Sequence, residues 1–180
     1  MKKIYTCVAA ICCCLAAAAQ TEKGNWMVGG NFELNTVSNN TTISLNPTAG
    51  VFVINNLALG GTVDLSYSKL GENRSTTFGI GPLARYYFGK SNFRPYLHGD
   101  LNFVSQKFKF PTGTNTENGI GYFLAGGIAA FLNRNVAVEA LAGYQHTKLR
   151  NIEGDGGFAL RIGFQVYLSP RDRIERVDNQ

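Results

Sequence analysis

The chain has 180 residues, of which 44% are hydrophobic and 16% charged, and its formal net charge is +5. The basic residues are scattered along the chain, which gives no support for nucleic-acid binding, because that function needs a basic stripe or patch. Twenty-one glycines together with 12 phenylalanines and 8 tyrosines are instead typical of a β-barrel or β-sandwich.

The first 19 residues have the pattern of a secretory signal peptide. Lys2 and Lys3 precede an apolar run, residues 4–19, that ends in small residues. Ala17 and Ala19 predict cleavage before Gln20, which leaves a mature chain of residues 20–180. The run is too short and too rich in alanine to favour a spanning helix of about 20 apolar residues.

All four cysteines of the sequence lie within the expected signal peptide. The mature chain is therefore expected to have no disulfide and no thiolate metal ligand. A lipoprotein is disfavoured because Ile11, rather than a small residue, precedes Cys12. Removal of the signal peptide lowers the net charge from +5 to +3, because it takes away two lysines and no acidic residue.

Apolar and polar residues alternate along the mature chain, in segments of about 10 to 13 residues separated by breaks rich in polar residues, Gly or Asn. No stretch after residue 20 is long and apolar enough for a spanning helix, so a membrane span would have to be a strand of a closed barrel. The clearest segment is 57–68, and segment 158–168 repeats its complete split into two faces. The pattern predicts eight strands: 26–38, 42–53, 57–68, 76–88, 95–108, 119–132, 136–146 and 158–168.

The breaks between these segments predict connections of two lengths. Those expected to be short are 54–56, 89–94 and 133–135, and the break at 39–41 is also brief. Longer polar loops are expected at 69–75, 109–118 and 147–157. An even number of strands, with short turns at one end and longer loops at the other, is the arrangement of outer-membrane barrels that have both termini on the periplasmic side.

The distribution of polar residues favours a membrane barrel over a soluble one. A soluble, periplasmic lipocalin-like carrier would turn its large apolar side chains inward and a densely charged face outward. Here one face is nearly free of charge, and the other has mostly Gly, Ala, Ser, Thr and Asn. Aromatic residues near both ends of the expected strands are typical of interfacial girdles. We therefore expect an apolar surface facing lipid and a polar lumen.

These features resemble the small porin-like family of outer-membrane β-barrels that includes the OmpX and OmpA-type barrel domains. The resemblance covers residues 24–168 and rests on the signal segment, the eight alternating segments and the closing FALRIGFQVYL. That closing segment is similar to the carboxy-terminal strand signal read by the outer-membrane assembly machinery. The signal usually ends the chain on an aromatic residue, whereas here Leu168 is followed by SPRDRIERVDNQ, residues 169–180, expected to be a short charged periplasmic tail.

The resemblance implies an all-β protein of the bacterial outer membrane. Residues 20–168 are expected to form an eight-stranded antiparallel up-and-down transmembrane barrel. Its expected partners are outer-membrane lipid, the assembly machinery during biogenesis and an extracellular ligand at the loops. A monomer is expected.

Six charged side chains fall on the face expected to line the lumen. Because an unpaired buried charge is costly, we expect them to form ion pairs. Glu33 and Arg161 lie about equally far along the first and last strands, so they are predicted to pair where the barrel closes. Arg85 is predicted to pair with Asp64 or Asp100 on a flanking strand. The predicted lumen charge network is Glu33, Asp64, Arg85, Asp100, Glu139 and Arg161.

The favoured function is that of a structural or interaction protein without enzymatic activity, which presents its loops for adhesion, binding or envelope integrity. The alternative is a narrow passive channel for ions or small solutes. The first is favoured because eight strands leave almost no open lumen. The inward side chains Phe52, Leu83, Tyr87, Phe123 and Phe131 are expected to fill what there is.

A lipid-modifying enzyme at the outer rim would need a histidine within hydrogen-bond reach of a serine and a carboxylate. His146, in YQHTK, has no serine two residues on, so it is a weak candidate. His98 forms an H-x-D motif with Asp100, and both are expected to point into the lumen, where a structural role is favoured. No metal site and no cofactor are assigned.

Overall fold

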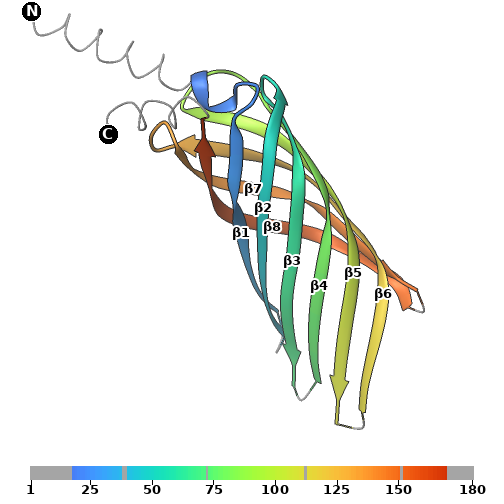
Figure 1. Ribbon diagram of the computed structural model, residues 1–180. Coiled ribbons are helices and arrows are strands. Elements are labelled where there is room, and N and C mark those ends of the chain that lie inside the picture. The colour runs from blue at the N-terminus through green and yellow to red at the C-terminus, as the bar shows by residue number, and fades with distance from the viewer. Residues whose placement is uncertain (1–17, 38–39, 72, 112, 151, 170–180) are drawn as a thin grey trace, which may run out of the picture.

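The computed structural model describes residues 18–37, 40–71, 73–111, 113–150 and 152–169. The expected signal peptide up to residue 17 and the tail from residue 170 lie outside the described residues. Within them, a short 3-10 helix precedes eight strands that close into one antiparallel barrel, because each strand pairs with its sequence neighbours and β1 pairs with β8 (Figure 1). The elements are η1 (Ala18–Thr21), β1 (Trp26–Val37), β2 (Asn40–Ile54), β3 (Leu57–Leu70), β4 (Asn73–Tyr87), β5 (Phe93–Phe110), β6 (Gly113–Phe131), β7 (Val136–Leu149) and β8 (Ile152–Leu168).

The predicted fold class is confirmed, since the barrel is all-β, antiparallel and up-and-down. Both ends of the described chain lie at the same end of the barrel, where η1 sits beside the end of β8 (Figure 1). We call this the η1 end and the opposite end the far end. Among the described residues, no helix is long and apolar enough to cross a membrane.

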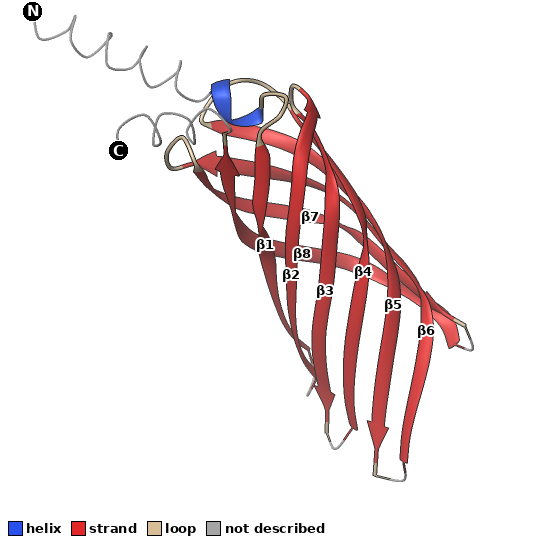
Figure 2. Cartoon of the chain, in the orientation of Figure 1, coloured by secondary structure: helices blue, strands red, loops and turns tan. Residues whose placement is uncertain are grey.

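The three long loops predicted at the far end were wrong, whereas the predicted connections 54–56 and 133–135 correspond closely to the observed ones, 55–56 and 132–135. Residues 109–118, expected to form a polar loop, lie mostly in β5 and β6, which have 18 and 19 residues. Likewise β3 runs to Leu70 and β4 begins at Asn73, and β7 runs to Leu149 and β8 begins at Ile152, so the predicted loops 69–75 and 147–157 are mostly strand. The longer connections, 88–92 and 132–135, lie at the η1 end (Figure 2).

The error has a physical cause. The polar stretch was interpreted as loop, but its backbone groups are paired across the ladder, with Lys109 opposite Thr114 and Gln106 opposite Glu117. Strands that continue beyond a lipid layer face water on their outer side, and a polar side chain there is compatible with a strand. The polar residues of this stretch therefore indicate that the strands are exposed to solvent there, and they do not mark a break in the β-sheet.

Large apolar side chains cover the outside of the barrel. Trp26 is 53% exposed and Phe158 is 86% exposed, and Leu59 and Leu65 also point away from the lumen. Polar and charged side chains such as Gln165 are buried inside. This is the reverse of a soluble lipocalin-like barrel, and it matches the predicted orientation of the two faces.

Glycines let amide side chains fill the middle of the lumen. Asn31 on β1 lies opposite Gly163 on β8, and Gln165 lies opposite Gly29. A Cβ atom at Gly163 would be only 2.3 Å from Asn31 Oδ1, and one at Gly29 would be 2.6 Å from Gln165 Oε1. Each amide therefore lies over a neighbouring glycine, and this packing requires that positions 29 and 163 have no side chain.

Candidate functional site

The η1 end of the lumen is closed by a layer of polar and aromatic side chains built around Glu139 on β7. Its carboxylate accepts hydrogen bonds from Arg85 Nη1 at 2.7 Å, and from the hydroxyls of Tyr87, Tyr96 and Tyr167 at 3.3, 3.2 and 3.1 Å. The side chains of Arg85 and Glu139 are both 0% exposed. A buried ion pair needs such additional hydrogen bonds, because its attraction alone does not offset the loss of water.

Apolar rings pack around this ion pair and complete the closure. The Tyr167 ring centroid lies 5.0 Å from that of Phe131 and 6.2 Å from that of Phe52. Arg85 Cζ lies 4.7 Å from the centroid of the Tyr96 ring. We call this layer the seal; it consists of Met27, Phe52, Arg85, Tyr87, Tyr96, Phe131, Glu139 and Tyr167, all buried.

The segment before β1 covers the outside of the seal. Arg94 on β5 donates hydrogen bonds to Thr21 Oγ1 at 2.8 Å and to Gln20 Oε1 at 3.2 Å, and its guanidinium lies 4.7 Å from the Phe131 ring centroid. The Thr21 hydroxyl in turn hydrogen-bonds Asn56 Oδ1 at 2.6 Å. The first residues after the expected cleavage site are thus fixed across the η1 end of the barrel.

The predicted contact between Glu33 and Arg161 across the closing strands is present. Arg161 Nε lies 3.3 Å from Glu33 Oε2, and both side chains are buried. Arg161 Nη2 donates to Gln145 Oε1 at 2.9 Å, and the guanidinium stacks 3.9 Å from the centroid of the Phe123 ring. This arginine is therefore held by three neighbours on different strands.

The predicted pairing of Arg85 with Asp64 or Asp100 was wrong, because Arg85 pairs with Glu139 across the lumen. In the ladder Arg85 lies opposite His98, and Asp100 is one inward position further along β5. The long arginine side chain extends toward the η1 end, away from both aspartates. Glu139 is in the network as predicted, but its partner comes from a strand that is not its neighbour.

The two aspartates belong to a second polar cluster, in the middle of the lumen. Asn46 donates from Nδ2 to Asp64 Oδ1, and Asn102 Nδ2 donates to Asp64 Oδ2 and Asp100 Oδ1, both at 2.7 Å. His98 Nε2 lies 2.9 Å from Asp100 Oδ2. These side chains come from β2, β3 and β5, and we call Asn46, Asp64, Asp100 and Asn102 the amide–carboxylate cluster.

A cavity of about 600 Å³ occupies the far half of the barrel, which corrects the expectation of an almost completely filled lumen. The cluster and the Glu33–Arg161 pair line its inner part, and hydroxyl side chains such as Ser44, Ser66 and Thr77 line its walls. Inward side chains become less buried toward the far end, from Asn102 to Gln106. The lumen is therefore a vestibule that opens at the far end and is closed at the other.

Neither histidine forms the arrangement of a rim enzyme. The His146 ring lies 5.6 Å from the Tyr122 ring, and within the described ranges it hydrogen-bonds neither a serine nor a carboxylate. His98 bridges two charged side chains, because Arg85 Nε donates to its Nδ1 at 3.3 Å while Nε2 faces Asp100. The described part of the chain contains no group of three or more His, Cys, Asp or Glu suited to a metal ion.

Several residues of the site were missed from the sequence, and Arg94 is the most important. It was assigned to a turn, although it precedes Tyr96, His98 and Asp100 at the same two-residue spacing and is 1% exposed. That spacing was a usable signal. Asn46 and Asn102 also lie on the inward face, but an asparagine in a strand carries no charge that marks it as part of a site.

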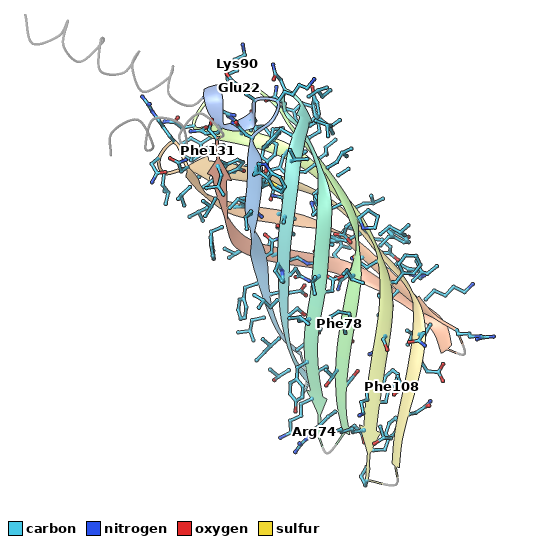
Figure 3. The ribbon with its side chains drawn as sticks, viewed as in Figure 1. Glu22, Arg74, Phe78, Lys90, Phe108 and Phe131 are labelled. Atoms are coloured by element: carbon cyan, nitrogen blue, oxygen red, sulfur yellow. The ribbon has the colours of Figure 1, made fainter. Side chains whose placement is uncertain are left out.

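Basic side chains form a row on the outer surface near the far end. Lys69 on β3 lies directly opposite Arg74 on β4, and Arg74 lies directly opposite Lys109 on β5. All three are exposed, and among the described residues no carboxylate lies within 4.0 Å of any of them. Arg74 is at the far end of the barrel, beyond Phe78 of the apolar surface (Figure 3). We call these three residues the basic row.

A closed barrel with apolar side chains outside and ion pairs inside is an integral membrane β-barrel. Residues 5–170 match the family model described as outer membrane protein beta-barrel domain, and the chain belongs to that family. It is therefore a bacterial outer-membrane β-barrel protein of the OmpA/OmpX type, as the resemblance implied.

Three solved structures share this fold at low sequence identity. Neisserial surface protein A is 20% identical with a TM-score of 0.60, and the match covers 79% of this chain and 94% of that one. The N-terminal barrel of Pseudomonas aeruginosa OprF is 12% identical (TM-score 0.53; 81% and 98% covered). The attachment invasion locus protein Ail of Yersinia pestis is 10% identical (TM-score 0.53; 81% and 99% covered). No match to a curated protein was found.

Proposed function

We propose that the protein is a closed, non-conducting, monomeric barrel with a structural role in the envelope, and that its basic row binds the phosphate groups of lipids in the outer leaflet. The observation that carries this proposal is the alignment of Lys69, Arg74 and Lys109 directly opposite one another on adjacent strands. Because the far end consists of extended strands and short turns, the proposal places the binding surface on the strands themselves.

Like charges directly opposite each other destabilise a β-ladder. An anionic group between them would remove this repulsion, and Arg and Lys are the side chains suited to phosphate. The row lies just beyond the apolar surface, at the depth expected for lipid headgroups. For it to face the outer leaflet, the η1 end and both termini have to be periplasmic, as in other outer-membrane barrels.

The test compares lipopolysaccharide with its dephosphorylated form as probes for the refolded chain in detergent. A neutralised variant carries Lys69→Gln, Arg74→Gln and Lys109→Gln. The matched control carries Lys23→Gln, Lys90→Gln and Arg134→Gln, which remove three exposed cations from the η1 end.

At about 1 kcal/mol for each cation near the surface, the neutralised variant should bind phosphorylated lipid about a hundredfold more weakly than the parent. The control should bind as the parent does, and dephosphorylated lipid should bind poorly to all three proteins. Equal retention of both lipid forms by the parent, or equal losses in the two variants, would contradict the proposal.

A narrow conduit is the second candidate, and the vestibule is the observation in its favour. The seal opposes it, because solute would have to pass the buried Arg85–Glu139 pair and the rings around it. We expect no conductance in planar bilayers, either from the parent or from an Arg161→Ala variant. Steady single-channel conductance from the parent would show that the lumen is open. We assign no catalytic role to His146.

A further inference from the structure

We propose that an apolar groove on the lipid-facing surface of β1 to β4 holds the end of an acyl chain, and that this chain belongs to the lipid whose phosphate group binds the basic row. The inference rests on the proposed function, because the basic row assigns the chain to the outer leaflet. The groove has a volume of about 410 Å³, within the range of about 300–1,000 Å³ that is usual for small-molecule sites. Its lining includes Pro47, Ala49, Gly61, Val63 and Ile80.

Small residues form the floor of the groove, and rows of larger outward side chains border it on both sides. Ala49 lies directly opposite Val28 on β1 and Gly61 on β3. The row toward the η1 end, the near rim, is Trp26, Val51 and Leu59, and the row toward the far end, the far rim, is Phe32, Leu45, Leu65 and Phe78. The convex surface of a second barrel cannot reach the floor past both rims, whereas a single hydrocarbon chain can.

Pro47 keeps the floor apolar where the β-ladder is interrupted. The pairing of β2 with β3 stops at Leu45 and resumes at Thr48. Pro47 has no N–H to leave unpaired, and its carbonyl oxygen accepts a hydrogen bond from the Thr62 hydroxyl at 3.3 Å. An unpaired backbone group would be costly in lipid. The floor therefore suits hydrocarbon better than a polar ligand.

The depth of the groove matches the reach of a lipid bound to the basic row. Strand β3 contributes Lys69 to the row and Val63 to the floor, six residues apart. At a rise of about 3.3 Å per residue and a tilt of about 45°, this separation is about 14 Å in depth. One leaflet of hydrocarbon is about 15 Å thick, half of the membrane core. Phe78 of the far rim lies between Arg74 and the middle of the barrel (Figure 3). A chain that starts at the row thus ends at the floor.

The experiment uses the refolded mature chain in detergent micelles. Trp26 is the reporter, because it is the one tryptophan of the sequence and belongs to the near rim. The probe is phosphatidic acid with two bromine atoms near the end of one acyl chain, since bromine quenches tryptophan fluorescence on contact. The matched probe has its bromine atoms near the head of the chain. We expect saturable quenching by the first probe and weaker quenching by the second. Equal quenching by both, or quenching that does not saturate, would overturn the proposal without any variant.

Gly61→Leu fills the groove, and Gly126→Leu is its matched control. A Cβ atom at Gly61 would meet only the Gly81 carbonyl oxygen, at 3.5 Å, and one at Gly126 would meet nothing within 4 Å, so the barrel should tolerate both changes. Gly61→Leu should weaken binding of the end-brominated probe about fivefold or more, because the chain loses many small packing contacts. Gly126→Leu should bind as the parent does. Equal affinities of the two variants would overturn the proposal.

The neutralised variant separates this inference from the proposed function, and it should also bind the probe more weakly. If it loses binding while Gly61→Leu binds as the parent does, the basic row is supported and the groove is refuted. If only Gly61→Leu loses binding, the chain in the groove does not belong to a lipid held by the row, and both proposals fail. A parent that sediments as a dimer, with a monomeric Gly61→Leu variant, would assign the groove to a second copy and refute the acyl chain.

Discussion

Removal of the Glu139 charge should destabilise the barrel more than removal of its partner Arg85. With Glu139→Gln, the Arg85 guanidinium stays buried without a carboxylate. Its remaining polar contacts in the described chain are neutral: His98 Nδ1 at 3.3 Å, the Tyr87 hydroxyl at 3.2 Å and Met27 Sδ at 3.7 Å, and Nη2 has no partner there. An uncompensated buried charge of this kind costs about 3–5 kcal/mol.

Arg85→Met leaves the opposite situation. The Glu139 carboxylate keeps three tyrosine hydroxyl donors, from Tyr87, Tyr96 and Tyr167. Because hydrogen bonds to a charged group are worth about 1.5–3 kcal/mol each, they offset much of the lost attraction, and we expect a loss of about 2–3 kcal/mol. The double variant should lose less than the sum of the two single losses, since it leaves no unpaired charge.

The assay is reversible urea unfolding of the refolded chain in phospholipid vesicles. Trp26, the one tryptophan of the sequence, reports the transition, because it lies on the outer surface of β1. Glu117→Gln is the control for the loss of an acidic residue outside the seal and should change the free energy of unfolding by less than about 0.5 kcal/mol. If Arg85→Met proved as costly as Glu139→Gln, the tyrosine hydroxyls would not be holding the carboxylate.

Three further changes test other parts of the barrel. Gly163→Ala should cost more than about 2 kcal/mol or prevent closure, because the added Cβ would lie 2.2 Å from a β1 backbone oxygen; Gly126→Ala, with nothing within 4 Å, should be nearly neutral. Heat-modifiable migration in detergent gels measures closure, and equal behaviour of the two would refute this packing. Arg94→Gln should speed tryptic cleavage after Lys23 without unfolding the barrel, and an unchanged rate would show that the segment is held by other contacts. Leu101→Arg should cost about 2–4 kcal/mol in vesicle-based unfolding, since Leu101 points outward into lipid, and a neutral effect would place it outside the apolar layer.

The sequence was sufficient to predict the barrel, but not to predict where its strands end. In segment 158–168 every second side chain is large and apolar, and this period of two survives in β8 because lipid and lumen impose opposite demands on alternate residues. At the far end that contrast disappears, since both faces meet water. Residues 109–118 therefore lost the signal of a strand while they kept its backbone pairing.

The site was predictable only where strand order alone determines the neighbours. Closure of a barrel makes the first and last strands adjacent, so the contact between Glu33 and Arg161 followed from counting along β1 and β8. The pair Arg85–Glu139 joins β4 and β7, which are not neighbours. Predicting it would have needed the stagger of the barrel and the direction of each side chain across the lumen, neither of which one sequence provides.

The seal and the vestibule are connected by a continuous chain of hydrogen bonds. It runs from Glu139 to Arg85, then through the His98 ring to Asp100, and on through Asn102 to Asp64. Since Arg85 donates to Nδ1 of His98, the ring proton lies on Nε2 and is donated to Asp100. The histidine ring thus accepts a hydrogen bond from the buried arginine on one side and donates one to Asp100 on the other. The lumen charges predicted from the sequence comprise four acids and two bases, which leaves an excess of negative charge. Each arginine is paired with a glutamate. The unmatched negative charge is therefore on the two aspartates at the inner end of the vestibule.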